Sequence, residues 1–268
     1  MSEPQKLRLG GMALRNGLLV HGPTHWAAAV RATEGSIKVA SGRKPSFGSG
    51  ATERVPGVRG VTKLAEAFAV IPMVKRALPE ARLPMQDART LGAMGAASLT
   101  GQALRRARGR TLASEAALAL LSMAPAMLAL RGGDLASYHG VEHKSIAAYE
   151  QDSDDASAAS KEHDRCGSNL VAPMLAGTAA GGAAVRRAGM RGPAADAIVG
   201  LGSVAFAVEV FAWSERHSDT ALARLLRRPG HEIQRLVGTR EPTPDQLAVG
   251  RAALDEILRV EEPTGSGD

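Results

Sequence analysis

Cysteine and aromatic residues are the scarcest in this sequence. Cys166 is the single cysteine among 268 residues, so no intramolecular disulfide can form, and the disulfide-stabilised scaffolds of small secreted proteins are excluded. Trp, Tyr and Phe together make up 3% of the chain, which leaves few side chains on which unpaired bases could stack. We therefore expect no nucleic-acid partner, although the net charge of +6 by itself would be compatible with one.

A long apolar segment near the N-terminus is also lacking. The first eleven residues (MSEPQKLRLGG) are polar and do not contain the apolar region of a secretory signal. We therefore expect the soluble parts of the protein to lie in the cytoplasm.

Residues 1–42 have the features of a small β-rich module. Residues 26–30 and 36–40 are short strand-like runs, and residues 33–35 (TEG) between them are typical of a hairpin turn. A further short apolar run lies between the glycines at 10–11 and the Gly-Pro pair at 22–23. Residues 43–57 carry Pro, Gly and Ser without periodicity, so we interpret them as a linker.

From residue 58 onward the pattern becomes helical, which makes the fold class mainly α. We interpret residues 58–261 as one multi-helix domain and residues 262–268 as a disordered tail. Val61, Leu64, Ala65 and Phe68 are spaced at i, i+3, i+4 and i+7 and predict one face of an amphipathic helix. Thr243 is a typical N-cap for a helix over residues 244–260.

Three stretches of this domain are nearly free of charge, namely residues 112–130, 168–185 and 197–213. Each approaches the length of ~20 apolar residues that a membrane-spanning helix needs. Arginine groups flank them, and the Gly177/Gly181 spacing is typical of packed membrane helices. Ala and Gly make the stretches only weakly hydrophobic, so a soluble bundle with Ala-rich core helices fits the same pattern. These stretches by themselves leave a membrane-associated bundle and a soluble one equally open.

A metal-binding pattern begins at Tyr138 with the residues YHGVEHK, which contain H-x-x-E-H. On a helix, His139, Glu142 and His143 share one face. Two imidazoles one turn apart can bind one metal ion, and the carboxylate between them can be a further ligand or a general base. Glu150, seven residues beyond His143, lies on the same face if the helix persists, and it could anchor an imidazole from behind.

A second chelating pair follows in the segment HDRCG, where His163 and Cys166 have the spacing H-x-x-C. A thiolate ligand favours zinc over magnesium or calcium. The acidic, polar segment QDSDDASAASKE between the two pairs is typical of a surface loop that returns the chain to the site. We expect zinc to be bound by His139, His143, His163 and Cys166.

Alternatives to a catalytic site remain open at this point. The histidines can be ordinary surface residues, and Cys166 a small core residue. Four protein ligands would also close a tetrahedral site, which is then structural, whereas a catalytic site needs an open position. Glu209 stands alone in an apolar stretch and is either a functional group in a membrane or a partner of an arginine or site residue.

The sequence resembles the YqhQ-like family, bacterial proteins of unknown function described as predicted metal-dependent enzymes. The resemblance rests on motifs spread over most of the chain: Gly10-Gly11 to Gly22-Pro23, Arg59-Gly60-Val61 with Leu64 and Glu66, Tyr138 to Lys144 with Tyr149-Glu150, His163 with Arg165-Cys166-Gly167, Glu209, and Gln234 to Pro242. It implies a multi-helix membrane protein with a metal site near the bilayer surface. Asn16 departs from the family pattern, which usually has a glutamate there, and the apolar region is shorter than usual.

These features predict a zinc-dependent enzyme at the bacterial cell membrane, most plausibly a hydrolase. Glu142 would be the catalytic base, and Glu150, Arg165, Glu209 and Gln234 would support the site. The alternative is a non-catalytic membrane scaffold or partner-binding protein, bound to a membrane-protein partner and holding a structural metal. No feature of the sequence identifies a substrate.

Overall fold

A computed structural model describes residues 6–48, 55, 57–84, 86–108, 111–131 and 133–262. Its strands are β1 (Gly10–Leu14), β2 (Gly17–His21), β3 (His25–Arg31) and β4 (Ile37–Arg43). Its helices are α1 (Val58–Ala77), α2 (Ala88–Arg108), α3 (Leu112–Ser122), α4 (Ala124–Leu130), α5 (Asp134–Glu150), the 3₁₀ turn η2 (Gly167–Leu170), α6 (Val171–Arg187), α7 (Pro193–Arg216), α8 (Ala221–Ile233), the π-helix η3 (Gln234–Gly238) and α9 (Pro244–Glu261). The predicted mainly helical fold with an N-terminal β-sheet is confirmed.

The strands form one antiparallel meander in the order β1-β2-β3-β4. The predicted turn at residues 33–35 joins β3 to β4, and Gly35 takes a φ of 92°, which favours glycine. Between β1 and β2 the chain turns at Asn16, whose side-chain amide donates to the carbonyls of Arg31 and Glu80 and accepts from the N–H of Arg82. At the position where the family pattern has a glutamate, this chain therefore uses an amide to join the sheet to the segment after α1.

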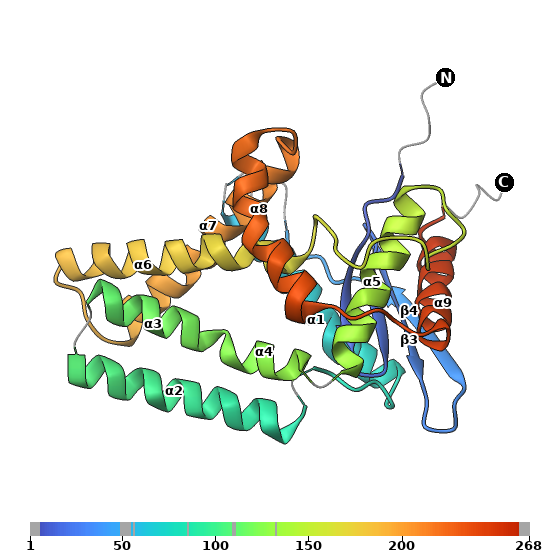
Figure 1. The fold of residues 1–268 in the computed structure, drawn as a ribbon, viewed down its shortest axis with the longest axis horizontal. Helices are drawn as coiled ribbons and strands as arrows, with labels where there is room; N and C mark the ends of the chain where they lie inside the picture. The colour runs from blue at the N-terminus through green and yellow to red at the C-terminus, as the bar shows by residue number, and fades with distance from the viewer. Residues whose placement is uncertain are drawn as a thin grey trace.

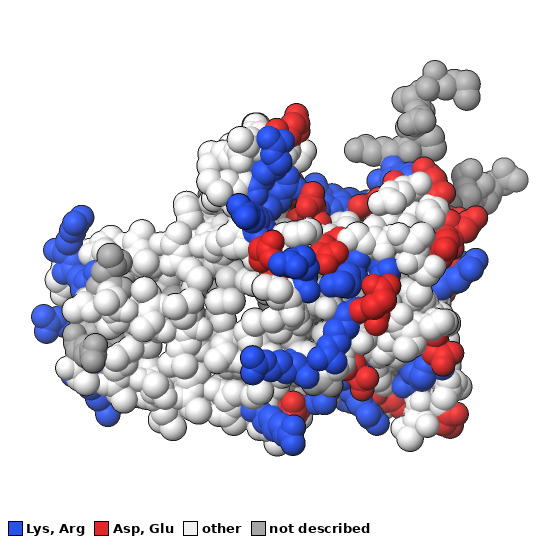
Figure 2. All heavy atoms as spheres, in the orientation of Figure 1, with Lys and Arg blue, Asp and Glu red and all other residues white. Residues whose placement is uncertain are grey.

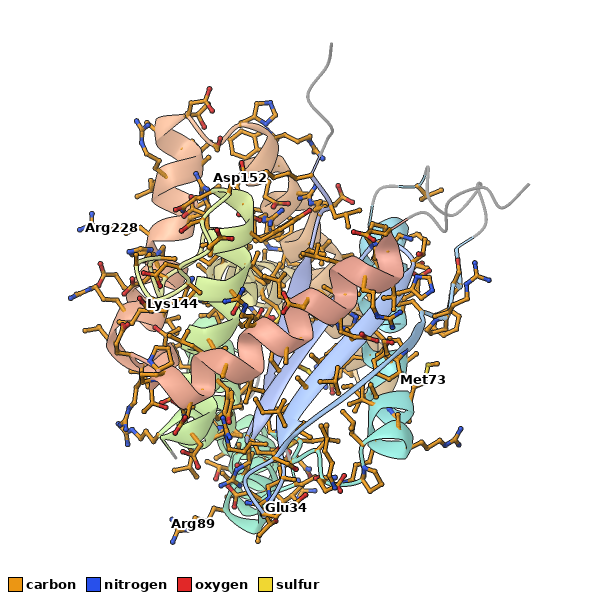
Figure 3. The ribbon with its side chains drawn as sticks, turned by 90° about the vertical axis from the view of Figure 1, so that its right-hand side faces the viewer. Glu34, Met73, Arg89, Lys144, Asp152 and Arg228 are labelled. Carbon is orange, nitrogen blue, oxygen red and sulfur yellow. The ribbon has the colours of Figure 1, made fainter. Side chains whose placement is uncertain are left out.

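Both faces of the sheet are covered by helices. On one face, Leu18, Val20 and Ala29 pack with residues of α5 and α9 such as Val141 and Ile257. Figure 3 shows α9 lying across this face with α5 beside it. The opposite face packs on α1 and the segment that follows it, through a buried cluster that contains Leu14, Leu19, Trp26, Val30, Val70, Val74 and Leu78. The strands therefore share their hydrophobic cores with helices distant in sequence.

The face predicted for α1 is wrong, although the helix itself is present. Phe68, expected on the packed side, is 56% exposed, whereas Val70 and Val74 of the same helix are fully buried. The sheet binds the side of α1 that carries these valines. The periodicity of the first turns did not identify that side, because only the partner surface selects which apolar stripe of a helix is covered.

The remaining helices form two hairpins that extend away from the sheet (Figure 1). One consists of α2 followed by α3 and α4, which are separated at Met123, and the other of α6 and α7. Their tips carry arginines, among them Arg106, Arg187 and Arg191.

Pro193–Arg216 is long and apolar enough to cross a membrane, with a mean hydropathy of 1.7 over its best window, of which 22% is buried. A bent pair, Ala116–Leu130 with Asp134–Glu150, passes the same test only when taken together.

Thr243 caps α9 as predicted: its side chain accepts the N–H of Gln246, and the Gln246 side chain accepts the N–H of Thr243. Residues 263–268, most of the predicted disordered tail, lie outside the described residues, as does much of the predicted linker.

Candidate metal centre

The centre is built on α5, at the junction of the sheet and the helical hairpins. The helix holds His139, Glu142 and His143 on one face, as their spacing predicts. Glu142 and His143 are buried and His139 is partly buried. Gly140 lies on the neighbouring side of the helix, where a Cβ atom would be 2.2 Å from the carbonyl oxygen of Arg240. The missing side chain therefore lets the segment after η3 approach α5.

The loop after α5 returns to the site because Lys144 holds it. This side chain is buried, and its ammonium donates to the carbonyls of Ser157 and Ala159 at 2.9 and 2.7 Å and pairs with Glu241. A buried ammonium needs such partners to offset its lost hydration. Figure 3 shows Lys144 on α5 beside this loop. The contacts bring Cys166 next to the histidines of α5, 3.4 Å from Nε2 of His139.

Both α5 histidines are fixed through their outer ring nitrogen. Nδ1 of His139 lies 2.8 Å from the carbonyl oxygen of Gly238, and Nδ1 of His143 lies 2.6 Å from that of Lys161. A carbonyl can only accept, so both Nδ1 atoms carry the proton and both Nε2 atoms present a lone pair. Nε2 of His143 is buried and has no hydrogen-bond partner among the described residues. This is the arrangement expected of metal-binding imidazoles.

His139, His143 and Cys166 form a group that could hold a metal ion, with ligand atoms all within 4.8 Å of one another. In a tetrahedral zinc site, nitrogen and sulfur ligands are separated by about 3.6 Å, from Zn–N and Zn–S distances of ~2.0 and ~2.3 Å. The separation of 3.4 Å between His139 and Cys166 matches this value. The residues present therefore fit a zinc ion with small adjustments of the imidazole of His143.

His163 lies beside the group but is not part of it. Its Nε2 is 3.1 Å from a carboxylate oxygen of Glu150, and its Nδ1 accepts the backbone N–H of Arg165. Glu150 thus lies behind an imidazole, where its spacing placed it, and also pairs with the guanidinium of Arg165. Gln234 is fully buried and holds the backbone of His163, accepting its N–H at 2.8 Å and donating to its carbonyl at 3.2 Å. These contacts support the segment that carries Cys166.

Burial sets the protonation of the centre. Burial, together with the smaller effect of the neighbouring His139, lowers the pKa of His143 to about 2, so this imidazole is neutral and ready to bind a cation. Burial raises the pKa of the Cys166 thiol to about 11, with a contribution from the nearby Glu142. The thiol must therefore lose a proton when it binds a metal.

Glu142 is close to the group without belonging to it. Burial raises the pKa of this carboxyl, and a hydrogen bond from the backbone N–H of Ala13 opposes the shift. The Glu142 side chain packs on Gly11 of β1, where a Cβ atom would lie 2.7 Å from its Cγ. Glycine is thus required at this position of the edge strand. A carboxyl with a raised pKa beside a metal site is suited to accept and donate a proton.

A cavity of about 480 Å³ adjoins the centre. His139, Glu142 and Cys166 line it, and β1, α2 and α4 complete its walls. The side of the centre that faces this cavity has no fourth protein ligand among the described residues.

Glu209 does not reach the centre. It accepts the N–H of Gly57 at 2.7 Å and so satisfies a backbone donor at the beginning of α1. Gly60 contacts Val208 next to it, where a Cβ atom would be 2.2 Å from the valine Cγ1. Glu209 therefore joins α7 to α1, and its predicted functional role stays a prediction.

Sequence reasoning missed the two carbonyls that orient the histidines and the part played by Lys144. The Gly238 carbonyl is available because residues 234–238 form a π-helix, in which Thr239 donates its hydroxyl to the carbonyl of Gln234. No side-chain pattern in the sequence predicts a π-helix, or a backbone carbonyl that orients a metal ligand. Lys144 could have been noticed, because a lysine must find partners once its side of the helix is buried.

Comparison with known proteins concerns the part of the chain that carries this centre. The family model described as "Protein of unknown function (DUF1385)" matches residues 133–260. This part of the chain, just under half of it, is therefore similar to a DUF1385 domain. This domain includes α5 and all residues of the metal-binding group, whereas the sheet and α1 to α4 precede it. No curated protein and no solved structure matches the chain. The match supports the prediction of an uncharacterised family for this part of the chain, and the YqhQ-like resemblance stays a prediction.

Proposed function

We propose that the protein is a zinc-dependent hydrolase that works at a membrane. The observation that supports this most directly is the position of the His139–His143–Cys166 group, which borders a cavity shared with Glu142. A structural zinc site is closed by four protein ligands, whereas a catalytic one keeps a position for substrate or water. Three ligands beside a cavity correspond to the second case.

Each residue has a distinct part in this proposal. His139, His143 and Cys166 hold the metal, with the imidazoles oriented by the carbonyls of Gly238 and Lys161. Zinc supplies Lewis acidity, which polarises the bond to be cleaved and makes water easier to deprotonate. Glu142 takes the proton from the attacking water and returns it to the leaving group.

The membrane part of the proposal rests on the surface of the two hairpins. Large apolar side chains are exposed along them, including Leu99, Leu120, Ile198, Leu201 and Phe206. In Figure 2 the charged residues gather over the sheet end and at the hairpin tips, and the surface between is uncharged. The apolar window of α7 is 22% buried, unlike a core helix of a soluble protein. This uncharged surface is suited to contact lipid, and the metal centre lies at its edge.

A closed, structural site is the second candidate, and one observation favours it. The ring of His163 lies 5.8 Å from that of His143, so a turn of His163 away from Glu150 would supply a fourth ligand. The protein would then be a scaffold that binds a membrane-protein partner through its apolar hairpins.

Metal analysis and complementation separate these candidates. Purified protein should contain one equivalent of zinc, and Cys166→Ala or His143→Ala should lose most of it, whereas His217→Ala should not. Glu142→Gln should keep the zinc and fail to complement a deletion strain under conditions where the strain shows a defect. A folded, metal-free wild-type protein would refute both candidates. Loss of zinc in His163→Ala together with full complementation by Glu142→Gln would favour the structural site.

A further inference from the structure

The cavity beside the metal centre is polar at one end and apolar along the rest. The polar end consists of His139, Glu142, Cys166 and Ser168. Beyond it, the walls are formed by Met12, Met94, Pro125, Ala126 and Leu130, from β1, α2 and α4. A volume of about 480 Å³ lies within the range of small-molecule binding sites.

A second hollow of about 630 Å³ continues the cavity away from the centre. The two share Met94, Ser122 and Pro125, so they form one trough between α2 and the α3–α4 segment. The far part is lined by Ala97, Gly101 and Leu118, and also by Ser98, Gln102 and Asp196. The trough therefore runs from the metal centre along the hairpin whose outer surface is apolar.

We propose that this trough binds the acyl chain of a lipid whose polar head reaches the metal centre. The inference rests on the proposed function and names its substrate class. A hydrocarbon chain needs no hydrogen-bond partners, and most of the wall beyond the centre is apolar. The polar residues in it are Thr90, Ser98, Gln102, Ser122 and Asp196. The distribution of polar and apolar walls matches an amphiphile with one polar end.

An extended peptide fits the same space less well. It would need partners for its backbone groups, and the edge strand β1 is the only strand in the wall of the cavity among the described elements. The N–H of Ala13 on that strand already donates to Glu142, and the N–H of Arg15 donates to the carbonyl of Arg82. Strand addition would therefore compete with contacts that hold the proposed base.

Photolabelling tests the proposal. Palmitic acid with a terminal diazirine is added to the full-length protein in detergent, and labelled peptides are mapped by mass spectrometry. Labelling should concentrate on α2 and α4 and be competed by unlabelled palmitic acid. Octanoic acid should compete much more weakly, since each buried methylene contributes about fourfold in affinity.

Two substitutions would fill the trough without changing any of the metal-binding residues. Ala126→Trp and, independently, Met94→Trp should each reduce labelling by about fifteenfold, the equivalent of two buried methylenes. Ala126 is exposed in the chain, so its replacement leaves the cores intact. Leu99→Trp on α2 is the matched control, because Leu99 is 69% exposed and does not line the trough. Zinc content of each variant is measured in parallel.

Labelling spread evenly over the outer surface of the hairpins, or unchanged in both Trp variants with normal zinc content, would overturn the acyl-chain site. Stronger competition by an apolar peptide than by palmitic acid would also overturn it. Specific labelling of a protein that contains no zinc would support the trough and refute the zinc hydrolase, so the two proposals fail separately.

Discussion

At His139, His143 and Cys166, the residue type supplies the ligand atom, and the surroundings set its protonation and orientation. The histidines supply lone pairs because backbone carbonyls hold their Nδ1 protons, and burial keeps His143 neutral by lowering its pKa to about 2. Cys166 is a protonated thiol at neutral pH, since burial raises its pKa to about 11. The ligand chemistry of the set is therefore neutral before metal arrives.

Zinc binding should consequently release about one proton from Cys166 at pH 7. Isothermal titration calorimetry in buffers of different ionisation enthalpy measures this number. Cys166→Ser should release fewer protons by about one and bind zinc more weakly. Equal proton release by both proteins would show that Cys166 is not a ligand.

His21 of β2, which is not one of the metal-binding residues, should make stability depend on pH. Burial, and to a smaller extent Lys44, lowers its pKa from 6.5 to about 4, and its Nδ1 is buried without a partner among the described residues. Between these values the unfolded chain binds a proton that the folded chain does not, so the free energy of unfolding falls as pH decreases. From pH 7 to 5 the loss is about 2 kcal/mol. Chemical denaturation should show this loss reduced in His21→Gln, and identical pH profiles would contradict it.

At the scale of elements, α5 owes its position to close approaches on several sides. Gly250 of α9 packs against Val141, where a Cβ atom would lie 2.4 Å from the valine Cγ1. Gly140 admits the carbonyl of Arg240, two residues after the carbonyl that binds His139. The packing of α5 and the orientation of the metal ligands are thus coupled.

Gly140→Ala should destabilise the fold by about 1–3 kcal/mol, because the added methyl group pushes the segment after η3 away from α5. Its zinc affinity should fall as the anchor of His139 moves, by about tenfold to a hundredfold. Gly92→Ala is the control: this helical glycine has nothing within 4 Å of the added Cβ atom, so the change should stabilise α2 by about 0.5–1 kcal/mol. Denaturation and zinc titration of both variants measure these effects, and equal behaviour would refute the coupling.

The whole molecule combines a charged end, containing the sheet and α9, with a pair of hairpins whose surface is uncharged between that end and the arginines at their tips (Figure 2). Between them, α8 carries arginines on one side and Leu222 and Leu225, 53% and 63% exposed, on another. In Figure 1 it stands across the direction of α6. A helix with these two sides at this position suits the surface of a bilayer into which the hairpins insert.

Leu201→Arg tests this arrangement. Leu201 of α7 is 63% exposed, so in water the change should be almost neutral, whereas within a bilayer an arginine costs about 2.5–3.5 kcal/mol. The variant should leave the membrane fraction or be degraded in cells. Leu236→Arg, which changes a 67% exposed leucine of η3, is the matched control and should behave as wild type. Wild-type protein that is soluble without detergent would overturn the membrane proposal.

The sequence by itself determined the helical class, the strands with their turn at residues 33–35, and the face of α5 on which His139, Glu142 and His143 meet. These features depend on local spacing, which a chain segment carries wherever it packs. It also placed Glu150 behind an imidazole, because a distance of seven residues is fixed once the helix persists.

Only the tertiary structure decided which candidate ligands converge. His163 and Cys166 lie three residues apart, yet Gln234 and Glu150 hold His163 aside while Cys166 turns to His139. Likewise, the Glu209 carboxylate accepts the N–H of Gly57, and the sheet covers one particular side of α1. The physical reason is the same in each case. Long-range packing and buried hydrogen bonds select among local options that have nearly equal energies, and their partners are remote in the sequence.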